Sequence, residues 1–112
     1  MGALLSHLFM PVGDLAAARA FWTEAIGLEV LMEYPGYVRV GGGGGFHIGM
    51  EQGDPGPGTR TEISVYVDDV DAVHRRLLDR GVEVEGPPQD QPWGARHCWL
   101  RDPDGRRMSI FT

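Results

Sequence analysis

Residues 62–84 read EISVYVDDVDAVHRRLLDRGVEV, and they repeat the plan of residues 7–30, HLFMPVGDLAAARAFWTEAIGLEV. Both stretches place an alternating strand, an acidic turn, an amphipathic helix, a glycine and a second strand in the same order. An offset of 55 residues (62 − 7) aligns the copies through most of their helices, and one residue must then be dropped to align Gly81 with Gly27. Two copies are too few for a solenoid, so the sequence predicts a paired, pseudo-symmetric domain.

Further strands are expected after each copy. Asp14 fits the cap at the start of a first helix at 15–26, which should bury Ala18, Phe21, Trp22 and Ala25, and a second helix is expected at 70–80. The predicted strands span residues 4–12, 29–33, 37–40, 46–50, 63–67, 82–85, 96–100 and 108–111. Glycine and proline predict a hairpin loop at 41–45, a linker at 52–61, a rim loop at 86–94 and a tight turn at 102–105.

Composition limits the classes of function. The chain has 112 residues, a net charge of −6 and ten basic residues, all arginine, that gather in no stripe, so we expect no nucleic-acid partner. No apolar run approaches the roughly 20 residues of a membrane span, and we expect no membrane partner. Cys98 is the single cysteine, so an intramolecular disulfide is impossible. A reducing compartment, and therefore a cytoplasmic protein, is the simplest expectation.

The chain resembles the vicinal oxygen chelate superfamily, which includes glyoxalase I, bleomycin-resistance proteins and extradiol dioxygenases. The resemblance rests on HLFMPVGDL followed by FWTEAIGLEV, on VDDVDA at 67–72, and on PWGARHCWLRDPDG at 92–105. It implies an α+β fold in which two paired βαβββ modules form a curled mixed sheet around a concave cleft, with the helices outside. Residues 1–112 would be one such domain, with module 1 at about 4–51, the linker at about 52–61 and module 2 at about 62–112.

Strand alternation predicts which side chains face the cleft, if the aliphatic side of each strand lies against the helices. This open side is rich in histidine and aromatic residues, which suit a flat, apolar small molecule. The resulting cleft set is His7, Phe9, His47, Glu62, Ser64, Tyr66, His97, Trp99, Ser109 and Phe111. The expected ligand-binding residues are Phe9, His47, Ser64, Tyr66, Trp99, Ser109 and Phe111, with Trp93 from the rim loop. By the same alternation Cys98 should be a buried, inert thiol.

The resemblance also implies metal ligands. Its first-strand ligands map to His7 and Glu62, but the glutamate expected on the last strand is Ser109 here. The remaining position is either His47, which would complete two imidazoles and a carboxylate for Ni, Fe, Mn or Zn, or Gly49, which would leave only two ligands. Glu62 and His97 are the candidates for proton transfer in an enzyme.

Two hypotheses about function therefore stay open. We favour a binding protein of the glyoxalase/bleomycin-resistance type that holds an apolar or aromatic ligand in the cleft, with antibiotic sequestration as one form of it. The alternative is a metal-dependent lyase, isomerase or dioxygenase that uses His7 and Glu62. The resemblance also implies a homodimer.

Overall fold

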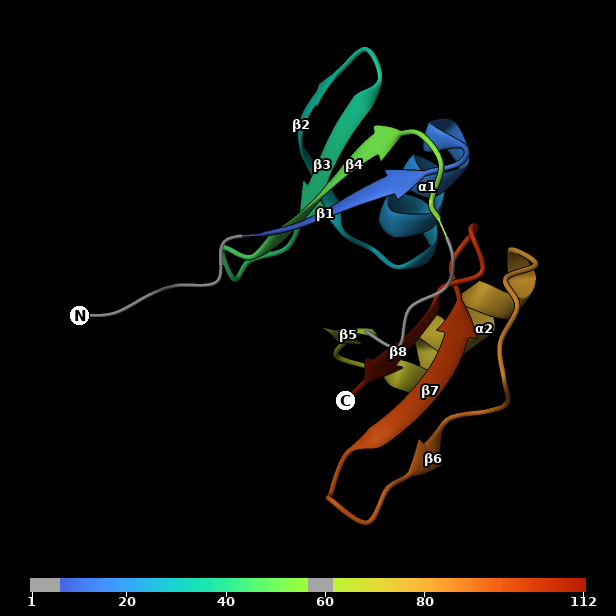
Figure 1. Cartoon of the computed structure of the whole chain (residues 1–112). Coiled ribbons are helices and arrows are strands. Elements are labelled where there is room, and N and C mark those ends of the chain that lie inside the picture. The colour runs from blue at the N-terminus through green and yellow to red at the C-terminus, as the bar shows by residue number, and fades with distance from the viewer. Residues whose placement is uncertain (1–6, 57–61) are drawn as a thin grey trace. The chain divides into compact units, whose positions relative to one another are not determined.

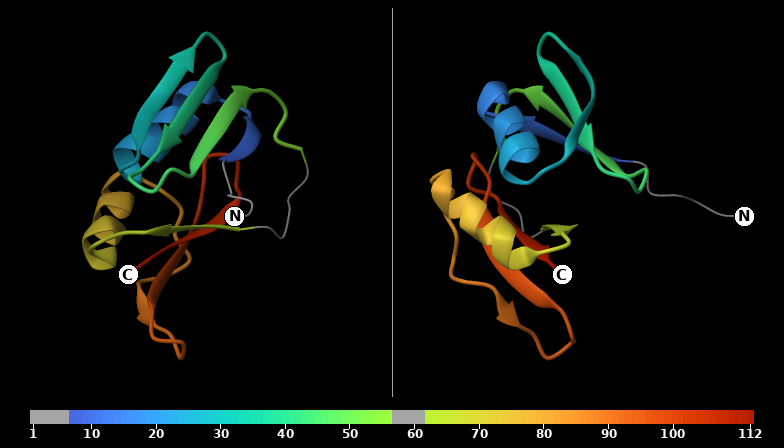
Figure 2. Two further views of the ribbon diagram at one scale, coloured as in Figure 1. Left: turned by 90° about the vertical axis from the view of Figure 1, so that its left-hand side faces the viewer. Right: turned by 180° about the vertical axis from the view of Figure 1, so that it is seen from behind.

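The computed structural model describes residues 7–56 and 62–112, and it divides the chain into two compact units, 1–56 and 57–112. Each unit is a four-stranded mixed sheet with its helix across one face (Figures 1 and 2). Unit 1 contains β1 (His7–Val12), α1 (Leu15–Ala20), the π-helical turn η1 (Phe21–Ala25), β2 (Glu29–Tyr34), β3 (Tyr37–Gly41) and β4 (His47–Gln52). Unit 2 contains β5 (Ile63–Tyr66), α2 (Val70–Asp79), β6 (Gln89–Asp90), β7 (Arg96–Arg101) and β8 (Arg107–Phe111).

The two sheets have the same topology. The strand order is β1-β4-β3-β2 in unit 1 and β5-β8-β7-β6 in unit 2. In each unit the first strand pairs in parallel with the last strand, and the other neighbours are antiparallel. The predicted pair of βαβββ modules is therefore confirmed. The first predicted strand begins at residue 4, but residues 4–6 lie outside the described part of the chain.

Both helices begin in the same way. The carboxylate of Asp14 accepts a hydrogen bond from the backbone N–H of Ala17 at 3.0 Å, which confirms the predicted cap. Asp69 caps α2 in the same manner through Ala72. In each unit, a polar side chain at or just after the end of the last strand accepts a further N–H from the start of the helix. In unit 1 the N–H of Leu15 donates to the side chain of Gln52 at 2.8 Å. In unit 2 the corresponding acceptor is Thr112 Oγ1, which receives the N–H of Val70 at 3.1 Å.

The π-helical turn explains why one residue must be dropped to align the copies. A π-turn places an extra residue in one turn of a helix. In unit 1 the N–H of Ile26 donates to the carbonyl of Phe21, five residues earlier, at 3.0 Å. Trp22, which precedes the shift in alignment, is buried like its counterpart Leu77 in α2. The predicted buried stripe, Ala18, Phe21, Trp22 and Ala25, is confirmed.

One strand prediction was wrong. Residues 82–85 form no strand, although Val84 makes an isolated bridge to Leu100 and two further backbone bonds join residues 83–85 to β7. The short strand β6 lies instead at Gln89–Asp90, inside the segment predicted to be a loop. Pro87 and Pro88 separate the two pieces, because proline has no N–H to continue a ladder. Strand β6 is an edge strand, the position in a sheet where neighbouring prolines are tolerated.

Candidate functional site

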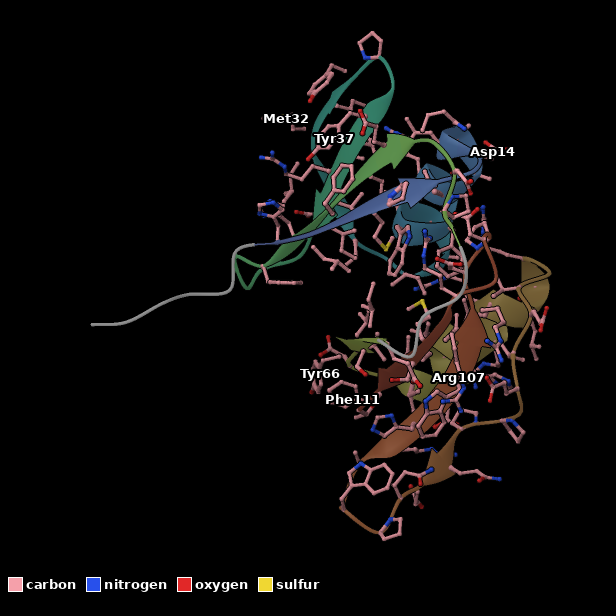
Figure 3. All side chains as sticks on the ribbon, in the orientation of Figure 1. Asp14, Met32, Tyr37, Tyr66, Arg107 and Phe111 are labelled. Atoms are coloured by element: carbon pink, nitrogen blue, oxygen red, sulfur yellow. The ribbon has the colours of Figure 1, made fainter. Side chains whose placement is uncertain are left out.

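The face of sheet β5-β8-β7-β6 that lies opposite the buried core residues of β7 carries a column of stacked rings. His97 stacks on Trp99 with ring centroids 4.9 Å apart, and on Phe111 of the neighbouring strand at 5.1 Å. Tyr66 meets Phe111 edge-on at 5.6 Å, and Figure 3 shows these two side chains together beside β8. Alternation along β7 produces the column, since its other residues, such as Cys98, are buried on the helix side. The predicted aromatic face is thus present within unit 2.

Both faces of the Trp99 ring are in contact with charged or aromatic groups of the protein. His97 covers one face, and the guanidinium of Arg107 lies 5.1 Å from the ring centroid, in cation–π range. The indole N–H of Trp99 donates to Glu62 at 3.2 Å. A ligand that keeps this column intact therefore meets the edges of its rings and does not insert between them.

A pocket of about 170 Å³ opens beside the column. Its walls combine the two rings with backbone, amide and carboxylate groups of the segment that precedes β7. The lining residues are Glu85, Gly86, Pro87, Gln89, Gln91, His97 and Trp99. Sequence reasoning found the two rings but missed Glu85, which it placed in a strand at 82–85. It also missed Gln89 and Gln91, because the loop prediction for 86–94 gave no orientation for their side chains.

Trp93 contacts the imidazole of His97. The Trp93 indole is 64% exposed, and its N–H lies 3.4 Å from His97 Nε2. An indole N–H can only donate, so His97 Nε2 is the acceptor in this contact. Nδ1 is buried and has no hydrogen-bond partner within the described residues. A role for His97 as a general base would first require Trp93 to release Nε2.

Ser109 occupies the position where the resemblance expects a metal-binding glutamate, and it pairs with a second serine. Ser109 is only 1% exposed, and its hydroxyl lies 2.8 Å from that of Ser64 on the parallel strand. The pair satisfies itself without a ligand. Neither of these predicted ligand-binding serines lines the pocket.

Glu62 belongs to a network of charges that borders the pocket. Arg107 donates from Nη1 to Glu62 at 2.9 Å and from Nε and Nη2 to Glu85 at 2.7 and 3.0 Å. Arg101 adds a longer ion pair to Glu85 at 3.5 Å. The hydrogen bonds from Arg107 hold the pKa of Glu85 below its usual value. The same contacts raise the pKa of Arg107, so the guanidinium is a permanent charge at this site.

In unit 1, the corresponding face of the sheet carries a pair of stacked imidazoles. His7 and His47 lie directly across from each other on the parallel strands β1 and β4, with ring centroids 5.0 Å apart and planes 4° apart. Phe9 is the next residue on the same face of β1 and is 52% exposed. It lies across from Gly49.

Tyr37 is a residue of this face that sequence reasoning missed. Its hydroxyl lies where the side chain of residue 49 would be, 2.5 Å from an ideal Cβ there, and it accepts a bond from Arg39 Nε at 3.2 Å. Tyr34 stacks on its ring at 4.9 Å, and Figure 3 shows Tyr37 and Met32 on the side of the sheet away from α1. Alternation along β3 could have placed Tyr37 on this face. Tyr37 and Gly41 are four residues apart and so lie on the same face of β3, and Gly41 lies across from His47.

Strand register identifies the counterparts of the predicted ligands. Phe9 pairs with Gly49 in unit 1, and Ser64, which is 55 residues after Phe9, pairs with Ser109 in unit 2. Gly49 is therefore the counterpart of Ser109, and His47 is the counterpart of Arg107.

The donor set does not fit a resident metal ion. Within residues 7–56 and 62–112, no group of three His, Cys, Asp or Glu side chains could hold one. His7 and His47 lie in unit 1, and Glu62, in unit 2, already binds a guanidinium. A serine and a glycine stand at the two last-strand positions, and neither offers an anionic ligand.

Comparison with known families identifies the chain's relatives. The model of the Glyoxalase/Bleomycin resistance protein/Dioxygenase superfamily matches residues 4–110. The chain belongs to this superfamily. The resemblance drawn from the motifs at 7–15, 21–30, 67–72 and 92–105 is thereby confirmed. No helix within the described ranges is long and apolar enough to cross a membrane.

Solved structures of the superfamily share the fold over nearly the whole chain. TnmS3, described as an antibiotic binding protein from Streptomyces sp. CB03234, is 30% identical with a TM-score of 0.81, covering 96% of this chain and 93% of TnmS3. A glyoxalase/bleomycin resistance protein from the same organism is 30% identical with a TM-score of 0.79, covering 97% and 100%. A superfamily member from Sphaerobacter thermophilus is 27% identical with a TM-score of 0.78, covering 97% and 96%.

A curated relative matches part of the chain. The uncharacterized protein Mb0911c of Mycobacterium bovis is 40% identical over 53 residues. That stretch is 47% of this chain and 35% of the relative, so the match spans about a third of the relative's length.

Proposed function

We propose that this protein binds a small, flat and largely apolar molecule in the pocket of unit 2 without changing it chemically. The observation that carries the proposal is the pocket of about 170 Å³, whose lining includes the stacked rings of His97 and Trp99. Ring edges and aliphatic groups favour an apolar ligand, and a few polar groups orient it. Gln89 and Gln91 supply such groups, since an amide both donates and accepts.

The relatives support this class of function. TnmS3 is described as an antibiotic binding protein, and it is 30% identical to this chain over nearly its full length. We therefore propose antibiotic sequestration as the form of binding to test first. The replacement of the expected glutamate by Ser109, bonded to Ser64, supports binding over catalysis.

The test is a ligand-observed NMR screen of one-ring and two-ring aromatic compounds, with antibiotics included. Hits are then mapped on the amide spectrum of the full chain. We expect shifts at Gly86, Gln89 and Gln91, unchanged affinity in EDTA, and at least tenfold weaker binding by Trp99→Ala. Tyr34→Ala is the matched control, because it removes an exposed ring from unit 1. Compounds that bind without shifting the amide signals of residues 85–91 would count against the proposal. Full affinity in Trp99→Ala would do the same.

The alternative proposal is a metal-dependent enzyme, and the stacked His7 and His47 pair favours it. Two imidazoles on neighbouring strands form part of the site of many metalloenzymes, but a carboxylate must join them. Elemental analysis of protein purified without a metal-binding tag separates the two proposals. We expect no stoichiometric metal. Near-stoichiometric metal that His7→Ala removes would make the enzyme the better proposal.

We also propose that the protein is a cytoplasmic homodimer. Cys98 is a free, buried thiol, which suits a reducing compartment. Exposed large apolar side chains, including Leu31, Met32 and Trp93, offer surface for a second copy. Light scattering after size-exclusion chromatography measures the mass directly, and a pure monomer would contradict the dimer.

A further inference from the structure

Arg107 contacts three groups of unit 2 at once. It forms a two-bond fork with Glu85 at 2.7 and 3.0 Å, a third bond with Glu62 at 2.9 Å, and it lies over the ring of Trp99 at 5.1 Å. Fork-like pairing of a guanidinium with a carboxylate fixes the direction of both groups. The charge of this arginine is therefore held at one place beside the pocket.

By strand register, that place is equivalent to His47 in the other unit. Ile63 pairs with Met108, so Glu62 lies across from Arg107 at the start of the same ladder. In unit 1 the equivalent partners are His7 and His47, which stack. The superfamily places a metal ligand at the first-strand position, and in unit 2 the side chain facing that position is itself a cation.

We propose that Arg107 is the built-in cation of unit 2 and excludes a divalent metal ion from Glu62. The proposal does not rest on the identity of the ligand, nor on the binding function proposed above. It assigns Arg107 a specificity-determining role, because its guanidinium keeps a divalent ion away from the carboxylate of Glu62.

The contacts explain why a metal ion cannot simply replace the guanidinium. A divalent ion bound to Glu62 would lie close to the positive charge of Arg107, which repels it. Displacing Arg107 would break its fork with Glu85 and its contact with Trp99. Glu62, Glu85, Arg101 and Arg107 also balance in formal charge, two negative against two positive, so the cluster has no excess negative charge to attract an ion.

The experiment removes the cation and measures metal binding. Mn²⁺ is titrated into the tag-free, full-length protein, and free Mn²⁺ is followed by electron paramagnetic resonance. Arg107→Gln leaves two carboxylates, Glu62 and Glu85, near one another, and paired carboxylates are ligands that Mn²⁺ prefers. We expect this variant to bind Mn²⁺ at least tenfold more tightly than the wild type, and the double variant Arg107→Gln/Glu62→Gln to lose the gain.

Two controls separate this effect from net charge and from misfolding. Arg75→Gln makes the same change of net charge on the exposed side of α2 and should alter Mn²⁺ affinity less than twofold. Glu62→Gln in the wild-type background should leave Mn²⁺ affinity unchanged, and this holds whether or not Arg107→Gln folds. The proposal is overturned if Glu62→Gln weakens wild-type Mn²⁺ binding tenfold, or if Arg107→Gln binds no better than Arg75→Gln.

Discussion

Gly49 is the residue whose replacement tests the arrangement of unit 1 most directly. A Cβ at this position would lie 2.5 Å from Tyr37 Oη and 3.2 Å from the ring atoms Cε1 and Cζ. Contacts of Cβ below 3.0 Å essentially never occur, so Gly49→Ala must push the hydroxyl away by about 0.5 Å (3.0 − 2.5). The ring cannot retreat freely, because Tyr34 stacks on it at 4.9 Å and Arg39 holds its hydroxyl at 3.2 Å.

The expected loss of stability follows from these contacts. Inserting a methyl group into a packed site costs about 1–3 kcal/mol. Replacing glycine by alanine restricts the unfolded chain and returns about 0.4–1 kcal/mol. We therefore expect Gly49→Ala to lower the free energy of unfolding by about 1–2 kcal/mol. At about 4 °C per kcal/mol for a chain of this size, the Tm should fall by about 4–8 °C.

Thermal and urea unfolding followed by circular dichroism measure the change. Gly43→Ala is the matched control, because no atom lies within 4 Å of its added Cβ, and it should stay within about 0.5 kcal/mol of the wild type. In a Tyr37→Phe background the 2.5 Å contact is absent, so Gly49→Ala should cost less than half as much. An equal cost in both backgrounds, or no cost in the wild type, would refute the placement of Tyr37 over β4.

Three further predictions test unit 2. Leu77→Ala should cost about 2–5 kcal/mol in urea unfolding, because Leu77 is fully buried, whereas Leu78→Ala, at a 52% exposed position, should stay within about 0.5 kcal/mol. Arg107 lowers the pKa of Glu85, so the ionised carboxylate stabilises the fold at pH values above its unfolded pKa near 4.5. This stabilisation is lost as the pH falls through the lower pKa of the folded protein. The Glu85→Gln variant should therefore lose less stability than the wild type between about pH 6 and pH 3. Burial raises the pKa of Cys98, and its thiol should react with a disulfide reagent only after the protein is denatured, so rapid labelling of the native protein would contradict its burial.

The fold could be predicted because its signals are local and occur twice. Alternation in β1 and β5, the acidic caps Asp14 and Asp69, and the buried stripe of α1 each follow from neighbouring residues. The one-residue difference between the copies was visible in the sequence, but its form as a π-turn was not. The backbone ladder decides which turn takes up an extra residue, and residue types do not determine this. The proline pair at 87–88 led to the loop prediction for 86–94, whereas the structure places the short strand β6 inside that segment.

The site could be predicted only in part, because its key contacts cross between strands. Parity along β7 placed His97 and Trp99 on one face, and the structure brings them together. The pairing of Glu62 with Arg107 depends on the register of β5 against β8, which alternation within one strand does not give. The fork from Arg107 to Glu85 also depends on the path of residues 83–85 beside β7, where the strand prediction was wrong.

The two units show where a duplicated module is free to diverge. On the helix side, Trp22 and Leu77 differ in size, yet both are buried, since packing there must fill the space between helix and sheet. On the opposite face, equivalent positions carry His7 with His47 in one unit and Glu62 with Arg107 in the other. An imidazole pair has lone pairs to offer a metal, whereas an ion pair has already satisfied its charges. A symmetric fold therefore presents two chemically different faces, and the function of each must be inferred from its own side chains.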